Sequence, residues 1–317
     1  MVKKRLEAGF TLIEVLVAMA LVTLISLVVL GALGPWMGLK QSIDTERKLQ
    51  DIKQGLASHY EMNAMAIELQ PGGTFGLFVS STTEGEGSCV SQEAAFQKVS
   101  SRFSESAQQL FRDGYANPWC VLVSGALSEN RDGVVLWYRN IAMVSSGRDG
   151  KLDAETKLDA AGNLVTGGDD TGVIISGFDI QRQKLKETMR RMNRIASMYE
   201  TYFTTRFLAY PDRDITRYYF SSQYDVTGTV GSTGGNWVNT AVALAPIGVS
   251  NMDAVSAWEL SNDIQTGNAN ESVGSTAVRS PQTSGTGTLP YTALLRARVP
   301  APSGQEAYAT QVVVGNY

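Results

Sequence analysis

A long apolar run near the N-terminus constrains this chain more than any other feature. From Phe10 to Leu33 the sequence reads FTLIEVLVAMALVTLISLVVLGAL. The polar residues within the run are Thr11, Glu14, Thr23 and Ser26. Because an α-helix rises about 1.5 Å per residue, about 20 apolar residues cross the ~30 Å hydrocarbon core of a bilayer. The run is therefore long enough to form one membrane-spanning helix.

The residues before the apolar run predict its orientation. Lys3, Lys4 and Arg5 precede it, and basic residues mark the cytoplasmic end of a membrane helix. The long remainder of the chain is then expected outside the cytoplasm. A secretory signal peptide is the rival interpretation. Against it, the run is too long for the apolar part of such a peptide, and no A-x-A cleavage site closes it.

Glu14 does not fit a plain membrane anchor. A carboxylate in a membrane segment is costly and needs a partner, but Phe10 to Leu33 contains no Lys, Arg or His. In one interpretation Glu14 lies at the headgroup level and its side chain reaches water. In the other, the chain is cut between Gly9 and Phe10, which creates an α-amino group at Phe10. In an assembly, that amine of one subunit would meet Glu14 of a neighbour.

These residues together resemble the class III leader and mature N-terminus of type IV pilins and type II secretion pseudopilins. The resemblance rests on the basic leader, Gly9 before the cut, Phe10 after it, Glu14 at the fifth mature position, and the apolar helix. It implies that a prepilin peptidase cleaves after Gly9 and that Phe10 is N-methylated. It also implies filament assembly with other pilin subunits, through a platform in the bacterial inner membrane. In that filament Glu14 would pair with a neighbouring amino terminus.

Composition limits what the rest of the chain can be. The 317 residues are enough for one large or two small domains beyond the anchor. The formal net charge is −4, so generic nucleic-acid binding is not expected, because phosphate contacts need Lys and Arg. The only histidine, His59, has no nucleophile motif beside it, and no glycine-rich phosphate loop leads into a helix. The sequence therefore predicts that the protein is not an enzyme.

The pattern of apolar residues predicts an α+β fold. An amphipathic stalk helix is expected from Leu39 to Leu69, after a kink or meltable section near Gly31–Gly38. Helical character is expected again over 92–111. Strand-like runs follow at 119–124, 134–144 and 172–180, and later at 237–249, 291–299 and 308–314. A long helix followed by antiparallel strands is typical of α+β proteins with a pilin-like head.

The order helix, loop, strands occurs twice. Residues 179–208 form a second amphipathic helix pattern that resembles the first stalk. One interpretation is a duplicated head, and the other is a single elaborated head with an inserted helix. The predicted domains are the leader peptide 1–9, the transmembrane or filament-core helix 10–34, the stalk and first pilin-like head 35–178, and the second pilin-like head 179–317.

An acidic loop is the best candidate for a small-ligand site. Asp149, Asp153, Asp169 and Asp170 supply the hard oxygen ligands that Ca²⁺ prefers, among glycines that allow tight turns. The segment resembles the loop that binds calcium in the major pseudopilins of type II secretion. The spacing does not fit an EF-hand, and a plain solvated loop is the alternative.

Two further features remain open at the level of sequence. Cys89 and Cys120 are expected in an oxidising compartment, where a disulfide would contribute ~3–4 kcal/mol; two buried free thiols are the alternative. The second helix is basic. Its Lys184, Lys186, Arg190, Arg191 and Arg194 form either a solvated face or a contact with an acidic neighbouring subunit or DNA.

Two functions follow from these observations. The first is a structural minor pilin or pseudopilin that is cleaved by prepilin peptidase. It would be anchored once in the inner membrane with a cytoplasmic N-terminus and a periplasmic head, and then assembled into a type IV pilus or a type II secretion pseudopilus. The second is an adhesin or uptake receptor displayed on the filament, with the second head as the binding module.

Overall fold

A computed structural model describes most of the chain. The described residues are 12–69, 89, 93–103, 106–220, 237–265, 272–273, 276–277, 289–302 and 305–317, and the side chains of residues 28–35 are not described. Gly9 and Phe10, the residues on either side of the predicted cut, lie outside the described residues.

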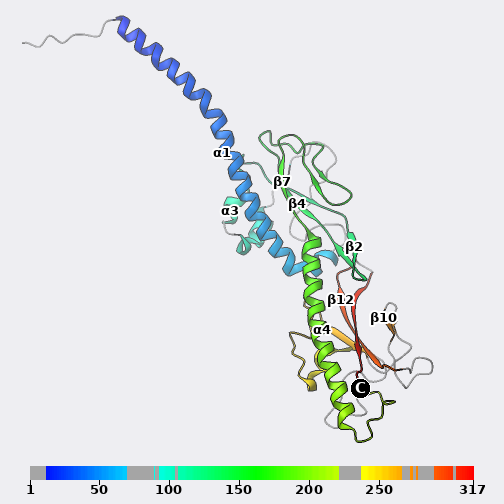
Figure 1. Cartoon of the computed structure of the whole chain (residues 1–317). Coiled ribbons are helices and arrows are strands. Elements are labelled where there is room, and N and C mark those ends of the chain that lie inside the picture. The colour runs from blue at the N-terminus through cyan, green and yellow to red at the C-terminus, as the bar shows by residue number, and fades with distance from the viewer. Residues whose placement is uncertain are drawn as a thin grey trace, which may run out of the picture.

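One long helix, α1 (Leu12–Leu69), opens the described chain. Its first part stands clear of the rest of the molecule, and its last part lies against the first head (Figure 1). The predicted apolar stripe of the stalk is buried, since Ile52, Leu56 and Tyr60 have no exposed surface. The helix ends at Leu69, directly before the Gln70-Pro71-Gly72 sequence, because Pro and Gly stop helices.

The kink expected near Gly31–Gly38 is wrong in position. α1 is helical through this section, and its non-helical φ and ψ angles, −115° and 18°, occur at Asn63. The Asn63 side-chain amide donates a 2.9 Å hydrogen bond to the His59 carbonyl oxygen, one helical turn earlier. Asn side chains compete with the backbone for such partners, which gives this position a physical reason to leave helical geometry.

The first head is built on a three-stranded antiparallel sheet in the order β1-β4-β7. The central strand β4 is buried along its whole length, because α1 covers one face of the sheet and the cluster around Cys89 and Leu152 covers the other. The strands of this head are β1 (Cys120–Val123), β2 (Leu127–Arg131), β3 (Val134–Tyr138), β4 (Ile141–Ser145), β5 (Lys157–Leu158), β6 (Leu164–Val165) and β7 (Thr171–Ile175). Strands β2 and β3 form a hairpin, as do β5 and β6. Its short helices are α2 (Glu93–Lys98), η1 (Ser100–Arg102) and α3 (Ala107–Leu110).

The second head packs helix α4 (Gly177–Ala209) on a four-stranded antiparallel sheet in the order β13-β12-β9-β8. Ser176 caps the start of α4, since its side chain accepts a hydrogen bond from the Asp179 backbone N–H. The strands are β8 (Val238–Asn239), β9 (Asn262–Gln265), β12 (Thr292–Val299) and β13 (Ala307–Val314), with a separate hairpin of β10 (Ser272–Val273) and β11 (Thr276–Ala277). The short helices are α5 (Thr240–Ala243) and η3 (Ala245–Ile247).

The two heads share part of their apolar core. Trp258, Val299 and Ala309 come from the second half of the chain, yet they belong to the cluster formed by α1 and the first sheet. A second cluster lies between α4 and the second sheet, around Tyr199, Phe203 and other aromatic rings. The second head therefore cannot be removed without exposing apolar surface of the first.

The architecture confirms the α+β prediction. A long helix on an antiparallel sheet occurs twice along the chain, as a duplicated head would give. None of the helices in the described part of the chain has the length and apolar character that crossing a membrane requires.

Several predicted strands were wrong in detail. Residues 237–249 form only the two-residue strand β8 before α5 and η3, because Asn239 caps a helix and Pro246 lies in the next helical turn. The run 172–180 ends as a strand at Ile175, where the Ser176 cap starts α4. The run 134–144 is two strands, β3 and β4, and the helical region 92–111 is broken into short helices.

Candidate functional site: the N-terminal helix and the junction of the heads

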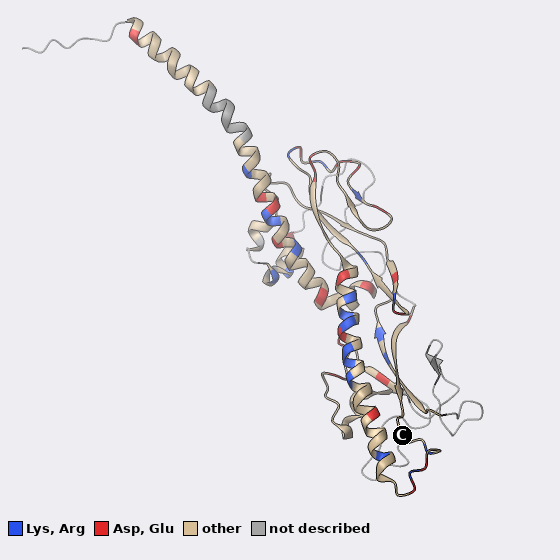
Figure 2. Ribbon diagram, in the orientation of Figure 1, with Lys and Arg blue, Asp and Glu red and all other residues tan. Residues whose placement is uncertain are grey.

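The first part of α1 presents apolar side chains to its surroundings. Leu12, Ile13, Leu16, Leu24 and Leu27 are each 59 to 83% exposed. By sequence, no charged residue lies between Glu14 and Lys40, and the described part of this stretch is uncharged in Figure 2. An uncharged helix with apolar side chains on all sides is suited to burial against lipid or other helices.

Glu14 lies in the first turn of α1. The structure thus places the one acid of the apolar segment at the helix end that faces the predicted cleavage site. Met19 and Val22 accept helix-internal hydrogen bonds from Thr23 and Ser26, so these two hydroxyls are also satisfied within the helix.

Comparison with known families identifies this segment. Residues 4–30 match the family model of the prokaryotic N-terminal methylation motif. The chain carries a prokaryotic N-terminal methylation motif. The match confirms the class III prepilin leader predicted from the sequence and is consistent with the type IV pilin and pseudopilin family. No curated protein and no solved structure matches the chain.

Beyond the methylation motif, a buried polar network joins the end of α1 to the first head. Glu68 is 1% exposed and Arg139 8% exposed. The Tyr60 hydroxyl donates to Glu68, and the Arg139 backbone N–H donates to the same carboxylate over 3.1 Å. The Arg139 guanidinium lies 3.4 Å from the other Glu68 oxygen. Burial raises the pKa of Glu68, although its hydrogen bonds with Tyr60 and the charge of Arg139 oppose that shift.

The network continues into the second head. The Trp258 indole N–H donates to the Gln181 side-chain oxygen over 2.7 Å, and the Gln181 amide lies 3.5 Å from the Ala64 carbonyl oxygen. Gly177 lies so close to the first head that an added Cβ would be 2.1 Å from the Arg139 carbonyl oxygen. Only glycine fits this approach. No local sequence pattern predicts this junction, because Glu68 and Arg139 are 71 residues apart in the chain.

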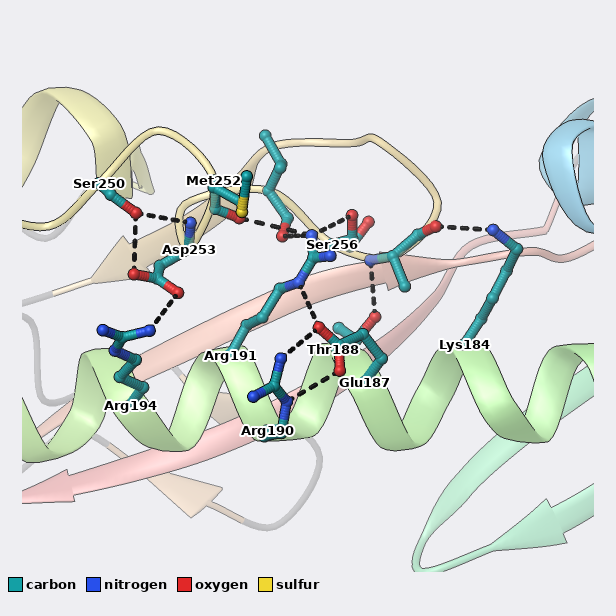
Figure 3. Close-up of polar contacts among 12 residues, drawn as sticks. Lys184, Glu187, Thr188, Arg190, Arg191, Arg194, Ser250, Met252, Asp253 and Ser256 are labelled. Carbon is teal, nitrogen blue, oxygen red and sulfur yellow. Dashed lines mark hydrogen bonds and ion pairs between the residues drawn. The ribbon is translucent and has the colours of Figure 1, made fainter.

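Most of the basic face of α4 holds the chain's own loop. The Arg191 guanidinium donates to the carbonyl oxygens of Val255 (3.1 Å) and Ser256 (3.3 Å), and Lys184 donates to the Ala257 carbonyl oxygen (2.8 Å) (Figure 3). The Thr188 hydroxyl accepts from the Ala257 N–H over 2.9 Å. These contacts fasten residues 252–257 to α4, so Lys184 and Arg191 are structural cations.

The outward cations of α4 are paired with nearby acids. Arg190 and Arg191 both contact Glu187, and their charges and hydrogen bonds lower its pKa to about 2 (Figure 3). Arg194 lies 3.5 Å from Asp253. Exposed pairs of this kind contribute ~0–1 kcal/mol each. The arrangement favours a solvated face over a nucleic-acid contact.

The acidic loop uses its carboxylates within the loop. Asp169 accepts from the Arg148 N–H, Asp149 from the Lys151 N–H and Asp153 from the Glu155 N–H. Asp170 accepts from the Thr156 hydroxyl, and its second oxygen is buried without a hydrogen bond. Burial and the charges of Asp169 and Asp153 raise the pKa of Asp170. In the described chain, no group of three or more His, Cys, Asp or Glu side chains could hold a metal ion, and calcium stays a prediction.

The other two sequence candidates lie inside the first head. Cys89 is joined to Cys120, the first residue of β1, and both are buried beside Leu122 and Val144. His59 lies on α1, where burial and the charge of Arg102 lower its pKa. His59 lies in the stalk helix beside Leu56 and Tyr60, which belong to the apolar core of the first head.

Proposed function

We propose that the protein is a structural subunit, a large minor pilin or pseudopilin of a type IV pilus or a type II secretion pseudopilus. The observation that carries this proposal is the methylation motif at residues 4–30, continued by the 58-residue helix α1. The function is assembly rather than turnover. The exposed apolar side chains of α1 are the surface through which such a subunit packs.

The processing and the location follow from the motif. Prepilin peptidase removes residues 1–9, and the new N-terminus at Phe10 is methylated. Residues 10–34 hold the subunit in the bacterial inner membrane, with the N-terminus in the cytoplasm and the two heads, 35–178 and 179–317, in the periplasm. The apolar run and the basic residues before it support this orientation. The assembly platform then moves the helix into the filament core among other subunits.

Glu14 sets the axial register of the subunit in the filament. Its carboxylate pairs with the Phe10 amine of a neighbour, which offers a positive charge in an apolar core. The spacing of Glu14 supports this role, because Glu14 follows Phe10 by four residues, which is about one turn of an α-helix. A mispaired subunit would leave a carboxylate in an apolar environment at a cost of several kcal/mol.

The proposal is tested by blocking the cut. We expect Gly9→Ala to abolish peptidase processing, so that the protein stays at its precursor mass in the membrane fraction and is absent from sheared filaments. Gly38→Ala is the matched control, since a Cβ at that glycine of α1 meets no other atom within 4 Å. If Gly9→Ala is processed and assembled like the wild type, the proposal is wrong.

A second candidate function is binding through the second head. The observation in its favour is that this head has its own aromatic core and lies at the far end of the molecule from the methylation motif (Figure 1). Leu208 and Ile215 are 54% and 47% exposed near that end. Replacing both with glutamate should leave filaments intact and abolish adhesion or uptake if the head is a receptor. Unchanged adhesion and uptake would argue against this candidate.

A further inference from the structure

We propose that the α1 segment just beyond the apolar run lies in the outer headgroup layer of the membrane before assembly. This inference rests on the proposed function, in which residues 10–34 span the bilayer. Trp36, Met37, Leu39 and Ile43 are 61, 56, 60 and 57% exposed, and we call these four residues the Trp36 patch. Large apolar side chains gathered on a surface mark an interaction site.

The protein's own head does not cover the Trp36 patch. The head meets α1 at Gln41, Thr45 and Lys48. The Gly114 N–H donates to the Thr45 hydroxyl over 3.0 Å, and the Lys48 ammonium lies 3.2 Å from the Arg112 carbonyl oxygen. At 3.6 residues per turn, these three positions lie roughly 120° to 180° around the helix from Trp36. Trp36, Leu39 and Ile43 fall together on the side away from the head.

The length of α1 places the Trp36 patch at the right depth. The 26 residues from Phe10 to Trp36 rise about 39 Å. The hydrocarbon core is ~30 Å thick, and the bilayer with its headgroup layers is ~40–45 Å thick. With Phe10 at the inner headgroup layer, Trp36 and Met37 lie within the outer one. Leu39, about 44 Å from Phe10, lies at its aqueous edge, and Ile43, about 50 Å from Phe10, lies just beyond it.

The chemistry of this surface favours lipid over a second protein helix. A groove of about 550 Å³ is lined by Trp36, Met37 and Ile43 together with Lys40, Asp44 and Arg47, and Gln41 of α1 and Gly114 of the first head complete its lining. Trp is enriched at membrane interfaces because its ring is apolar and its N–H is polar. The stem of Lys40 can lie along apolar surface while its charge meets lipid phosphates, whereas the Arg47 guanidinium is paired with Asp44 over 2.8 Å. A helix–helix contact in the filament would have to bury these charges.

The test uses the full-length protein in vesicles of phosphatidylethanolamine and phosphatidylglycerol. Tryptophan fluorescence is quenched with phospholipids brominated either near the headgroup or near the chain end. The contribution of Trp36 is the difference between the wild type and Trp36→Phe. We expect shallow bromines to quench this contribution about twofold more than deep ones, because the ring lies at the interface. Trp137→Phe, on β3 of the first head, is the matched control and should remove no lipid-quenched signal.

A second reporter separates this inference from the proposed function. In the Trp36→Phe background, Leu24→Trp places a ring about 21 Å along the helix from Phe10, near the bilayer centre, where deep bromines should quench it. If Leu24→Trp is quenched by lipid but Trp36 is not, the inference is wrong and membrane insertion stands. If neither is quenched, insertion itself fails. If Trp36 is shielded only as the protein-to-lipid ratio rises, a second subunit covers the patch, and the inference is overturned.

Discussion

Glu68 shows how a single buried charge can hold two parts of this chain together. Its carboxylate accepts from the Tyr60 hydroxyl on the same helix and from the Arg139 backbone N–H at the end of the β2–β3 hairpin. A buried charge is tolerated only when its oxygens are paired, because desolvation costs several kcal/mol per ion. Glu68 therefore specifies where the end of α1 meets the first sheet.

We expect Glu68→Ala to destabilise the folded protein by about 3–5 kcal/mol, because it leaves the Arg139 charge buried without its partner. Glu68→Gln keeps an acceptor and a similar volume, so its cost should be smaller, about 1 kcal/mol. Urea unfolding in detergent, followed by tryptophan fluorescence, measures both. Equal effects of the two variants would contradict the assignment of Glu68 as the paired acceptor.

The same residue predicts a pH dependence. Burial raises the pKa of Glu68 in the folded protein above the ordinary value of a glutamate side chain. The pKa of Glu68 is lower in the unfolded chain than in the folded protein. At a pH between these two pKa values, the folded state binds more protons than the unfolded state. The Glu68 contribution to stability should then fall as the pH rises. The difference in unfolding free energy between wild type and Glu68→Gln should follow this slope, and a pH-independent difference would contradict it.

The importance of some residues can be seen from the sequence alone, and that of others cannot. Glu14 stands out in the sequence, because an acid in an uncharged apolar run conflicts with its own neighbours, and its role in assembly stays a prediction. The Glu68–Arg139 pair could not, because 71 residues separate its members and each is unremarkable in its local sequence. Gly177 likewise gives no local signal, since its need for glycine comes from the carbonyl oxygen of Arg139 across the junction.

At the scale of elements, helix α4 holds a loop of the second head, residues 252–257, in place. Residues 252–257 have little regular structure, and Arg191, Thr188 and Lys184 hold them by their carbonyl and N–H groups. Trp258 directly follows this loop and enters the core of the first head. The attachment of this loop to α4 therefore positions Trp258 between the two heads.

We expect Arg191→Gln to destabilise the second head by about 1 kcal/mol, because the part-buried carbonyl oxygens of Val255 and Ser256 lose their donor. Arg190→Gln is the matched control. Arg190 is 74% exposed on its side chain, and an exposed pair of this kind contributes ~0–1 kcal/mol. Limited proteolysis should cut the loop faster in Arg191→Gln alone. Equal rates in both variants would show that the loop does not depend on Arg191.

The predicted boundaries of helices and strands match the structure where the local sequence signals all indicate the same element. The paired strands β12 and β13 lie where alternating apolar residues predicted them. The prediction failed at 237–249, where apolar composition suggested a strand but the Asn239 cap and Pro246 start helical turns. It also missed β9 within a polar segment, because Asn262 and Asp263 become strand residues only through pairing with β12.

At the scale of the whole molecule, the chain combines a long N-terminal helix with two connected heads. The heads share core residues and the Gln181–Trp258 junction, so the second head is held in place on the first. The two heads therefore form one unit, and the second head lies at the end of the molecule far from the methylation motif (Figure 1). The α+β class and the motif could be predicted from local patterns. The shared core depends on contacts between distant segments, and no local pattern reveals it.

The central claim is that this chain is processed as a prepilin, and the N-terminus of the mature protein tests it most directly. Mass spectrometry of the protein from filaments or membranes should give an N-terminal peptide that begins at Phe10, followed by Thr11, and carries one added methyl group. A mature protein that still begins at Met1, or that is cut after the apolar run as by signal peptidase, would contradict the account.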